Sequence, residues 1–137
     1  MNYWIIVESY HNRNEDAIHK FQYLGVDLDK FKKKKFSNED ILITYVTKLM
    51  KFSDIRKVVN NNLINLPNTF NYSFKLTKCI QTQILKNLDE IEWINAKPIL
   101  NKLETFMNKK INLQLLNAPI KVNTNDYNII KKSFNIN

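Results

Sequence analysis

The chain has 137 residues, of which 44% are hydrophobic and 25% are charged, as in an ordinary globular protein with one hydrophobic core. We therefore expect a single domain over residues 1–137. Cys79 is the only cysteine, which excludes an internal disulfide, and the two histidines show no spacing typical of zinc sites. These counts predict no metal and no cofactor.

The charge of the chain points to the kind of partner it binds. A formal net charge of +8 favours a polyanion such as nucleic acid. The excess comes almost wholly from lysine, and coding bias in an AT-rich genome would also produce it. No apolar run approaches the roughly 20 residues of a membrane-spanning helix, and the run from Tyr3 to Val7 is too short for a signal peptide. We therefore expect a cytoplasmic protein with no membrane partner.

The N-terminal stretch predicts a strand, a polar corner and a helix. Aromatic and β-branched residues from Tyr3 to Val7 favour a buried strand, which gives way to a polar segment from Glu8 to Asn12. Asn14 is a suitable cap for a helix from about Glu15 to Phe21. The apolar stripe of this helix would consist of Ala17, Ile18 and Phe21.

Gly25 is the only glycine in the chain and lies in a second, short extended piece, Tyr23 to Val26. A unique glycine here indicates a positive φ or the close approach of another group. Together with the polar corner it makes a candidate pocket. The same pattern also fits an ordinary strand-to-helix connection with a turn glycine.

The segment from Asp27 to Phe36 is polar and basic and predicts a surface loop or a short helix. Phe31 and Phe36 flank four consecutive lysines. Lysines of this kind add salt-dependent affinity for phosphates without reading sequence. A solvated run of charges is the alternative interpretation.

The middle of the chain predicts strands. Ile41 to Thr47 is rich in β-branched residues and favours a central strand, with Phe52 to Val59 as its hairpin partner. An asparagine-rich loop is expected from Asn60 to Asn68. Thr69 to Thr77 alternates between apolar and polar residues, which predicts a half-buried strand.

The segment from Ile80 to Ile94 is ambiguous. Its isoleucines and leucines recur at helical spacing, but its last four residues fit a short strand equally well. Pro98 can occupy the first position of one or two helical turns.

The C-terminal stretch predicts a strand and a helix. Ile111 to Leu116 alternates and favours a last strand, and Pro119 to Asn123 connects it to an amphipathic terminal helix. Thr124 or Asn125 can cap this helix. The chain as a whole therefore predicts an α+β fold: a small, mixed, mostly antiparallel β-barrel of five to seven strands flanked by short α-helices.

Several segments resemble one known family in the same order along the chain. They are Asn2 to Ile6 (NYWII), Tyr23 to Val26 (YLGV), Ser37 to Thr47 (SNEDILITYVT), Lys51 to Ile55 (KFSDI), and Ile99 to Ile130 with its FMNKK and NDYNII pieces. The chain resembles the EVE domain family of the PUA-like superfamily and, more distantly, the YTH domain. The resemblance spans nearly the whole chain.

The resemblance implies a non-enzymatic module that binds DNA or RNA and accepts a flipped, modified nucleobase. Such a pocket needs aromatic faces for stacking and polar groups that read the base edge, with a basic rim for phosphates. The pocket residues implied by position are Ser9, Tyr10, Asn12, Tyr23, Leu24, Gly25, Val26, Tyr45, Phe52 and Asn112. The expected phosphate contacts are Lys32, Lys33, Lys34, Lys35, Lys109 and Lys110.

Within this set, Tyr23 would stack on the base, Gly25 would allow close approach, and Asn112 would read a base edge. The alternation around Tyr45 and Phe52 also permits a place in the core. Neither histidine lies beside a nucleophile and the carboxylates show no close paired spacing, so we expect no enzymatic activity. The alternatives are a PUA-like enzyme acting on nucleic acid or nucleotide, and an inactive relative serving as a small interaction protein.

Overall fold

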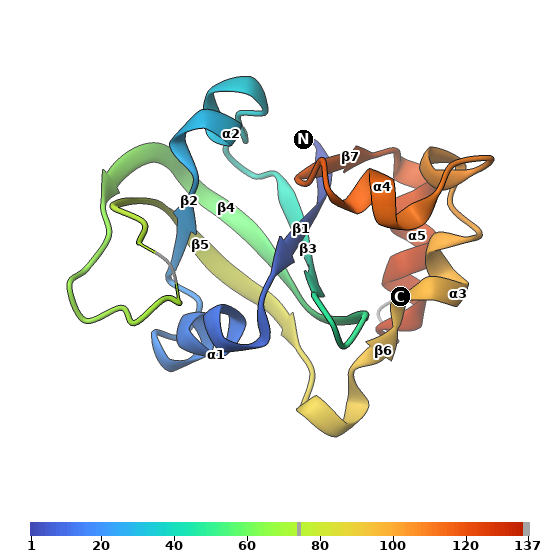
Figure 1. Cartoon of the computed structure of the whole chain (residues 1–137), viewed down its shortest axis with the longest axis horizontal. Helices are drawn as coiled ribbons and strands as arrows, with labels where there is room; N and C mark the ends of the chain where they lie inside the picture. The colour runs from blue at the N-terminus through green and yellow to red at the C-terminus, as the bar shows by residue number, and fades with distance from the viewer. Residues whose placement is uncertain (74, 136–137) are drawn as a thin grey trace.

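The structure, a computed structural model, describes residues 1–73 and 75–135. In this part of the chain the backbone forms one seven-stranded sheet and five α-helices (Figure 1). The strands are β1 (Tyr3–Glu8), β2 (Tyr23–Val26), β3 (Ile41–Val46), β4 (Lys51–Asn65), β5 (Lys78–Asn87), β6 (Ile94–Asn95) and β7 (Ile120–Val122). The helices are α1 (Tyr10–Ile18), α2 (Leu28–Lys33), α3 (Ala96–Leu100), α4 (Ile111–Leu115) and α5 (Thr124–Ser133), with 3₁₀ turns at Glu90–Glu92 and Glu104–Phe106. None of the described helices is long and apolar enough to cross a membrane.

The sheet is mostly antiparallel, as predicted. Its strand order is β2-β5-β4-β3-β1-β7, and β6 pairs with one end of β4. The exception is β1, which runs parallel to β3 with Tyr3 opposite Ile41, while its other edge pairs antiparallel with β7. A parallel pair needs a long crossover, and residues 9–40, which contain α1, β2 and α2, supply it.

The predicted closure into a barrel is wrong for the residues described. The sheet ends at β2 on one side and at β7 on the other, and these two edges do not pair. Lys34, just after α2, instead reaches across and donates to the backbone carbonyls of Asn117 and Pro119, the second at 3.0 Å. Because β2 has four residues and β7 only three, side chains rather than ladder hydrogen bonds span the gap.

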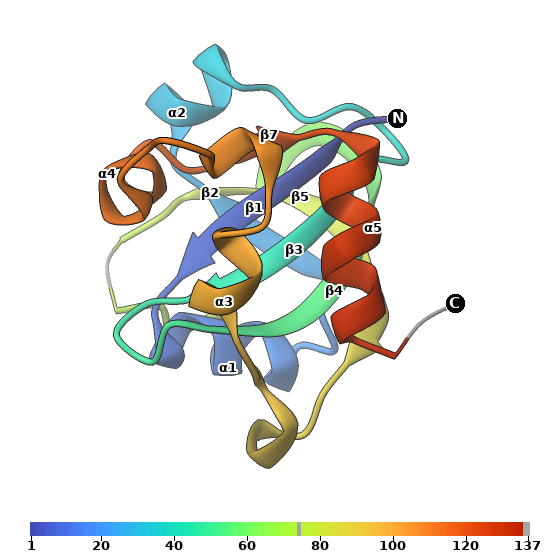
Figure 2. The ribbon, with the colours of Figure 1, turned by 90° about the vertical axis from the view of Figure 1, so that its right-hand side faces the viewer.

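Two apolar cores lie on opposite faces of the sheet. The side chains of β1 alternate between them: Ile5 packs with β3, α3 and α5, whereas Trp4 and Ile6 pack with β2 and α2. This is the period-2 alternation of a strand that is buried on both faces. Figure 2 shows α5 lying across one face, with α2 at the far edge of the molecule.

The first helix differs from its prediction. It begins at Tyr10 rather than Glu15, because Ser9 caps it by accepting a hydrogen bond from the Asn12 amide at 3.1 Å. Its predicted apolar stripe is wrong in part: Ile18 is 72% exposed, and Phe21 is buried but lies beyond the end of the helix. The buried side chains of α1 are instead polar, and they are Asn12, Arg13, Glu15 and Asp16.

Two predictions in the middle of the chain are wrong. The expected loop from Asn60 to Asn68 is in large part strand, because β4 continues to Asn65 and pairs with β5 through several register shifts. The expected strand from Thr69 to Thr77 is irregular in its described residues, and Phe74 lies outside them. Phe70 stacks on His19, directly after α1, and Tyr72 donates to Asp16 on α1, so neither is held by a neighbouring strand.

The ambiguous segment from Ile80 to Ile94 begins as a strand rather than a helix. Lys78 to Asn87 is a strand, followed by a 3₁₀ turn and the short β6. Ile111 to Leu115 is a helix, so the predicted strand there is wrong. A segment of five residues is too short for its pattern of apolar residues to distinguish a helix from a strand. The predicted connection from Pro119 to Asn123 contains β7, and Asn123 caps the terminal helix one residue earlier than expected.

Candidate functional site

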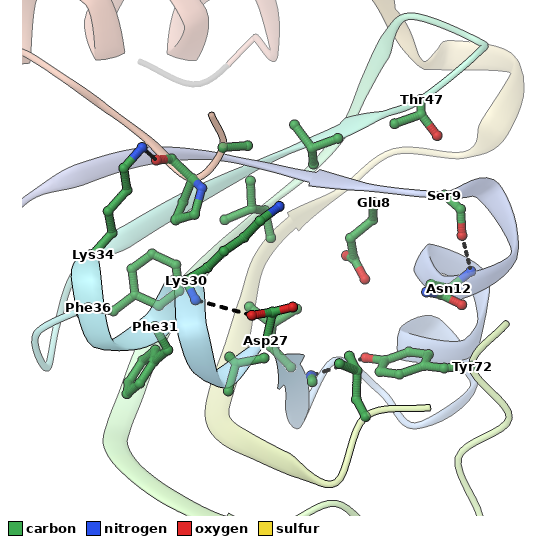
Figure 3. A pocket seen from close by; sticks show the side chains of 18 of the residues that line it. Glu8, Ser9, Asn12, Asp27, Lys30, Phe31, Lys34, Phe36, Thr47 and Tyr72 are labelled. Carbon is green, nitrogen blue, oxygen red and sulfur yellow. Dashed lines mark hydrogen bonds between the residues drawn. The ribbon is translucent and has the colours of Figure 1, made fainter. Parts of the chain in front are cut away.

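A cavity of about 440 Å³ lies between the two unpaired edges of the sheet (Figure 3). Its walls are the end of β1 with the start of α1, strand β2, helix α2, residues 115–119 before β7, and the loop of residues 66–77. The cavity thus lies between β2 and the segment that leads into β7. Its volume lies within the range of small-molecule sites.

One end of the cavity is polar. Glu8, Ser9, Asn12 and Tyr72 gather there, on the right of Figure 3. Asn12 turns its side-chain carbonyl to the Ser73 amide at 2.8 Å. The Tyr72 hydroxyl accepts a hydrogen bond from the Gly25 amide at 3.2 Å and donates to Asp16. These contacts fix the aromatic ring of Tyr72 as a wall of the cavity.

The other end is basic and aromatic. Lys30, Phe31 and Lys34 from the α2 region lie there together with Phe36, on the left of Figure 3. Asp27 caps α2 by accepting a hydrogen bond from the Lys30 amide at 3.1 Å. The cavity therefore has a hydrogen-bonding end and a cationic end.

Gly25 lies where Tyr72 crosses β2. Its φ is not positive, so the close-approach alternative explains the glycine. A Cβ at this position would lie 2.3 Å from Cε2 of Tyr72, which is closer than two carbon atoms can pack.

A buried charge network supports the polar end. Arg56, on β4, is fully buried and donates to Glu8 at 2.9 Å, to Asp16 at 2.7 Å and to Asp54 at 2.7 Å. Arg13 donates to the second oxygen of Asp54 at 3.2 Å. Buried charges are tolerated only when they are paired in this way.

The network shifts the protonation of its members in opposite directions. Burial raises the pKa of Glu8 well above its ordinary value, the nearby Asp16 carboxylate raises it further, and Arg56 only partly offsets both effects. Burial also opposes ionisation of Asp54, but Arg56 and Arg13 outweigh it and hold the pKa of Asp54 below its ordinary value. Burial and Asp16 raise the pKa of Tyr72, whose hydroxyl therefore keeps its proton.

Six of the predicted site residues line this cavity: Ser9, Asn12, Leu24, Gly25, Val26 and Lys34. Tyr10 and Tyr23 do not line it. Tyr10 lies against Trp93 and donates to Glu90, and Tyr23 packs edge-on against Phe70.

The remaining predicted residues are spread over three places. Tyr45 and Phe52 are buried in the core. Asn112 lies with Lys109 and Lys110 at a separate hollow of about 390 Å³ that also includes Lys97. The other three predicted phosphate contacts are exposed on or beside α2, and they are Lys32, Lys33 and Lys35.

Glu8, Lys30 and Tyr72 line the cavity but were not among the predicted site residues. Glu8 is a charged residue directly after a buried strand, which is a signal that the sequence does carry. Lys30 lies just before the run Lys32–Lys35, and nothing in the sequence distinguishes it from the lysines of that run. Tyr72 belongs to the predicted strand from Thr69 to Thr77, where it was assigned to an apolar face.

Similar folds occur among solved structures. The YTH domain of the Zygosaccharomyces rouxii MRB1 protein, solved in complex with N6-methyladenosine RNA, has a TM-score of 0.72 at 10% identity, over 97% of this chain and 86% of that one. The Pho92 YTH domain, solved in complex with m6A, has a TM-score of 0.70 at 11% identity, over 99% and 87%. A Pseudomonas syringae protein has a TM-score of 0.59 at 8% identity, over 96% and 99%.

At these identities the likeness shows the fold alone, which is that of YTH domains and agrees with the predicted PUA-like architecture. No protein-family model matches the sequence, and comparison with curated proteins gave no significant match. Membership of the EVE family therefore stays a prediction.

Proposed function

We propose that this protein is a non-enzymatic RNA-binding module that takes one flipped, modified nucleobase into the cavity between β1, β2 and α2. The observation that carries the proposal is the cavity's two-ended lining. Hydrogen-bonding groups and the Tyr72 ring lie at one end, and lysines lie at the other. A nucleotide matches these two ends, because proteins recognise its base through hydrogen bonds and stacking, while its phosphate is anionic and binds lysine.

The fold supports this reading. Two YTH domains with the same fold were solved with N6-methyladenosine RNA or with m6A, and a fold can be shared without a shared ligand. The argument for this chain therefore rests on its own cavity. Base–aromatic stacking contributes roughly 1–3 kcal/mol per base, so the Tyr72 ring is a sufficient platform for one base.

Fluorescence anisotropy with short RNAs that differ in one central base tests the proposal. The bases are adenine, N6-methyladenine, cytosine and 5-methylcytosine, each also in a DNA strand of the same sequence, at two salt concentrations. We expect one modified base in RNA to bind at least about tenfold tighter than its unmodified parent, which is about 1.4 kcal/mol. Mass spectrometry of the recovered RNA should show it unchanged.

Two tyrosine variants form a matched pair for this experiment. Tyr72→Ala removes the ring that lines the cavity and should abolish the preference for the modified base. Tyr23→Ala removes a ring that packs outside the cavity against Phe70 and should preserve it. If every RNA binds alike and added salt removes all binding, the lysines alone are acting and the proposal fails.

A further inference from the structure

The buried network beside the cavity has unequal numbers of opposite charges. Its two guanidinium groups belong to Arg13 and Arg56, and its three carboxyl groups belong to Glu8, Asp16 and Asp54. If every member were ionised, the network would hold one uncompensated negative charge. A buried charge without a partner is costly, so the network needs one more positive charge or one proton.

The hydrogen bonds show which carboxyl group is incomplete. Both oxygens of Asp54 accept hydrogen bonds from arginine, and Asp16 accepts from Arg56 on one oxygen and from Tyr72 on the other. Glu8 accepts from Arg56 through Oε1. Among the described residues, Oε2 of Glu8 is the one carboxylate oxygen of the network that accepts no hydrogen bond from an arginine, a hydroxyl or an amide, and a protonated Glu8 can only bond to the neighbouring Asp16 carboxylate.

The incomplete oxygen belongs to the side chain that lines the cavity. The Glu8 side chain is 10% exposed, whereas those of Asp16 and Asp54 are fully buried. Figure 3 shows Glu8 facing into the space between Asn12 and Tyr72. An occupant of the polar end of the cavity therefore meets the open position of the network.

We propose that Glu8 selects the occupant of the cavity and that its preferred ligand is a nucleobase with a positive charge fixed by alkylation of a ring nitrogen. The charged edge of the base binds Oε2 of Glu8 and completes the network. The Tyr72 ring beside it also favours a cation. This inference rests on the proposed function and specifies its ligand.

The lysines of the cavity come from the α2 side, across from Glu8. The Lys34 ammonium group lies at the far end, held by the carbonyls of Asn117 and Pro119, whereas the Lys30 side chain extends from α2 toward the middle of the cavity (Figure 3). Lys34 lies where the phosphate of the same nucleotide would be. A cationic base with an anionic phosphate matches both ends of the cavity.

Binding of a cation is coupled to release of a proton. The groups that face Glu8 are Asp16 and Arg13 from α1, Arg56 and Asp54 from β4, Tyr72 from the loop of residues 66–77, and Asp27 with the lysines across the cavity. Burial and Asp16 raise the pKa of Glu8, so this side chain keeps its proton to a higher pH than an exposed glutamate does. A cation displaces that proton, so its affinity should rise with pH by up to about tenfold per pH unit below the pKa of Glu8.

Two isomeric bases test the proposal. Short RNAs carry either 1-methyladenine, which is cationic at neutral pH, or N6-methyladenine, which is neutral and has the same composition. Affinity is measured by anisotropy from about pH 5 to about pH 7.5, where the charge of each base stays constant. We expect the cationic isomer to bind at least tenfold tighter at the upper pH and to weaken as the pH falls, while the neutral isomer does not weaken.

Glu8→Gln should remove both the preference for the cation and its pH dependence, while binding of the N6-methyladenine RNA remains. Glu92→Gln, on an exposed 3₁₀ turn outside the cavity, is the matched control and should change neither. If Glu8→Gln does not fold, the two isomers and the pH series on the unaltered protein decide.

The outcomes separate this inference from the proposed function. Tighter binding of the neutral isomer, or equal affinities of both isomers with no pH dependence of the cation, overturns the role of Glu8 and leaves a base-binding cavity standing. Failure of every RNA, charged or neutral, to bind in a Tyr72-dependent way overturns both.

Discussion

Gly25 and Tyr72 act as a pair at the residue scale. The tyrosine ring occupies the space where any other residue at position 25 would place its Cβ. Its hydroxyl also accepts a hydrogen bond from the Gly25 amide, which links the loop of residues 66–77 to β2. The shape of the cavity therefore depends on the absence of one methyl group.

Gly25→Ala should destabilise the protein by about 1–3 kcal/mol, the usual cost of overpacking, because Tyr72 must move. The same substitution in a Tyr72→Ala background should cost much less, because the clashing ring is gone. Urea unfolding of the four proteins of this double-mutant cycle measures the coupling. Equal costs of Gly25→Ala in the two backgrounds would show that the ring is not what excludes a side chain.

Glu8 should also give the free energy of unfolding a pH dependence. Its pKa in the folded protein is raised above the ordinary value of 4.5, so its contribution to stability is fully present below that pH and is lost as the pH rises through the folded pKa. Glu8→Gln should therefore gain stability relative to the unaltered protein as the pH increases. Urea unfolding over a pH series checks this, and a constant difference between the two proteins would contradict it.

At the scale of elements, helix α1 works as a polar clamp. Glu15 accepts a hydrogen bond from the Asn71 amide at 2.9 Å, Asn12 accepts from the Ser73 amide at 2.8 Å, and Asp16 accepts from the Tyr72 hydroxyl. Side chains that usually face solvent thus bind a loop and shape the cavity wall. The helix owes its place to these hydrogen bonds more than to apolar packing.

The clamp predicts site-specific hydrogen exchange. Asn12→Ala should raise the exchange rate of the Ser73 amide, because that amide loses its acceptor. Glu15→Ala should do the same for Asn71. Each substitution serves as the control for the other in NMR-detected exchange, and an equal increase at both amides in either variant would indicate general opening of the loop instead.

The strands follow from local sequence patterns, whereas the buried face of α1 does not. Strands β1, β2 and β3 were predictable because apolar runs of β-branched and aromatic residues identify them locally. The face of α1 was not, because Ile18 is exposed and Asp16 is fully buried. That inversion depends on Arg56, which lies 40 residues further on and pairs with Asp16, so no local pattern records it.

The candidate site was predictable to a similar extent. The unique glycine and the polar residues after β1 lie at one cavity, which Ser9, Asn12 and Gly25 line. Tyr72 was missed because its alternating neighbours resemble a strand. Its position is set by hydrogen bonds to α1 and β2 that form only in the folded chain.

At the scale of the whole molecule, lysines are placed unevenly around the cavity. Lys32 and Lys33 lie exposed in the last turn of α2, which forms a cavity wall, whereas Lys131 and Lys132 lie in the last turn of α5, which does not. The two pairs carry the same charge in equivalent helical positions. They form a matched test of the proposed RNA path.

Lys32→Ala with Lys33→Ala should weaken RNA binding and reduce the slope of log affinity against log salt by about 1.4, or roughly 0.7 for each phosphate contact on a single strand. Lys131→Ala with Lys132→Ala should leave the slope nearly unchanged. Anisotropy titrations at four salt concentrations measure both. Equal reductions in the two double variants would mean that net charge, rather than a path along α2, attracts the RNA.

The order of the strands could not be derived from the sequence. Each strand is recognisable alone, but whether the sheet closes depends on whether β2 reaches β7, and these are separated by most of the chain. Family resemblance supplied the PUA-like architecture, and the open edge is a property of this chain's own short strands. The cavity is therefore a result of topology rather than of any motif.

The pairing of β1 with β7 has a consequence for synthesis on the ribosome. β1 is synthesised before its partner Ile120–Val122, with residues 9–119 in between. At about 5–20 residues per second, one edge of an apolar strand stays unpaired for several seconds. Unpaired strand edges recruit other chains, so products that stall before Ile120 should aggregate more readily than the finished protein, and this protein's dependence on chaperones should be greatest while it is being made.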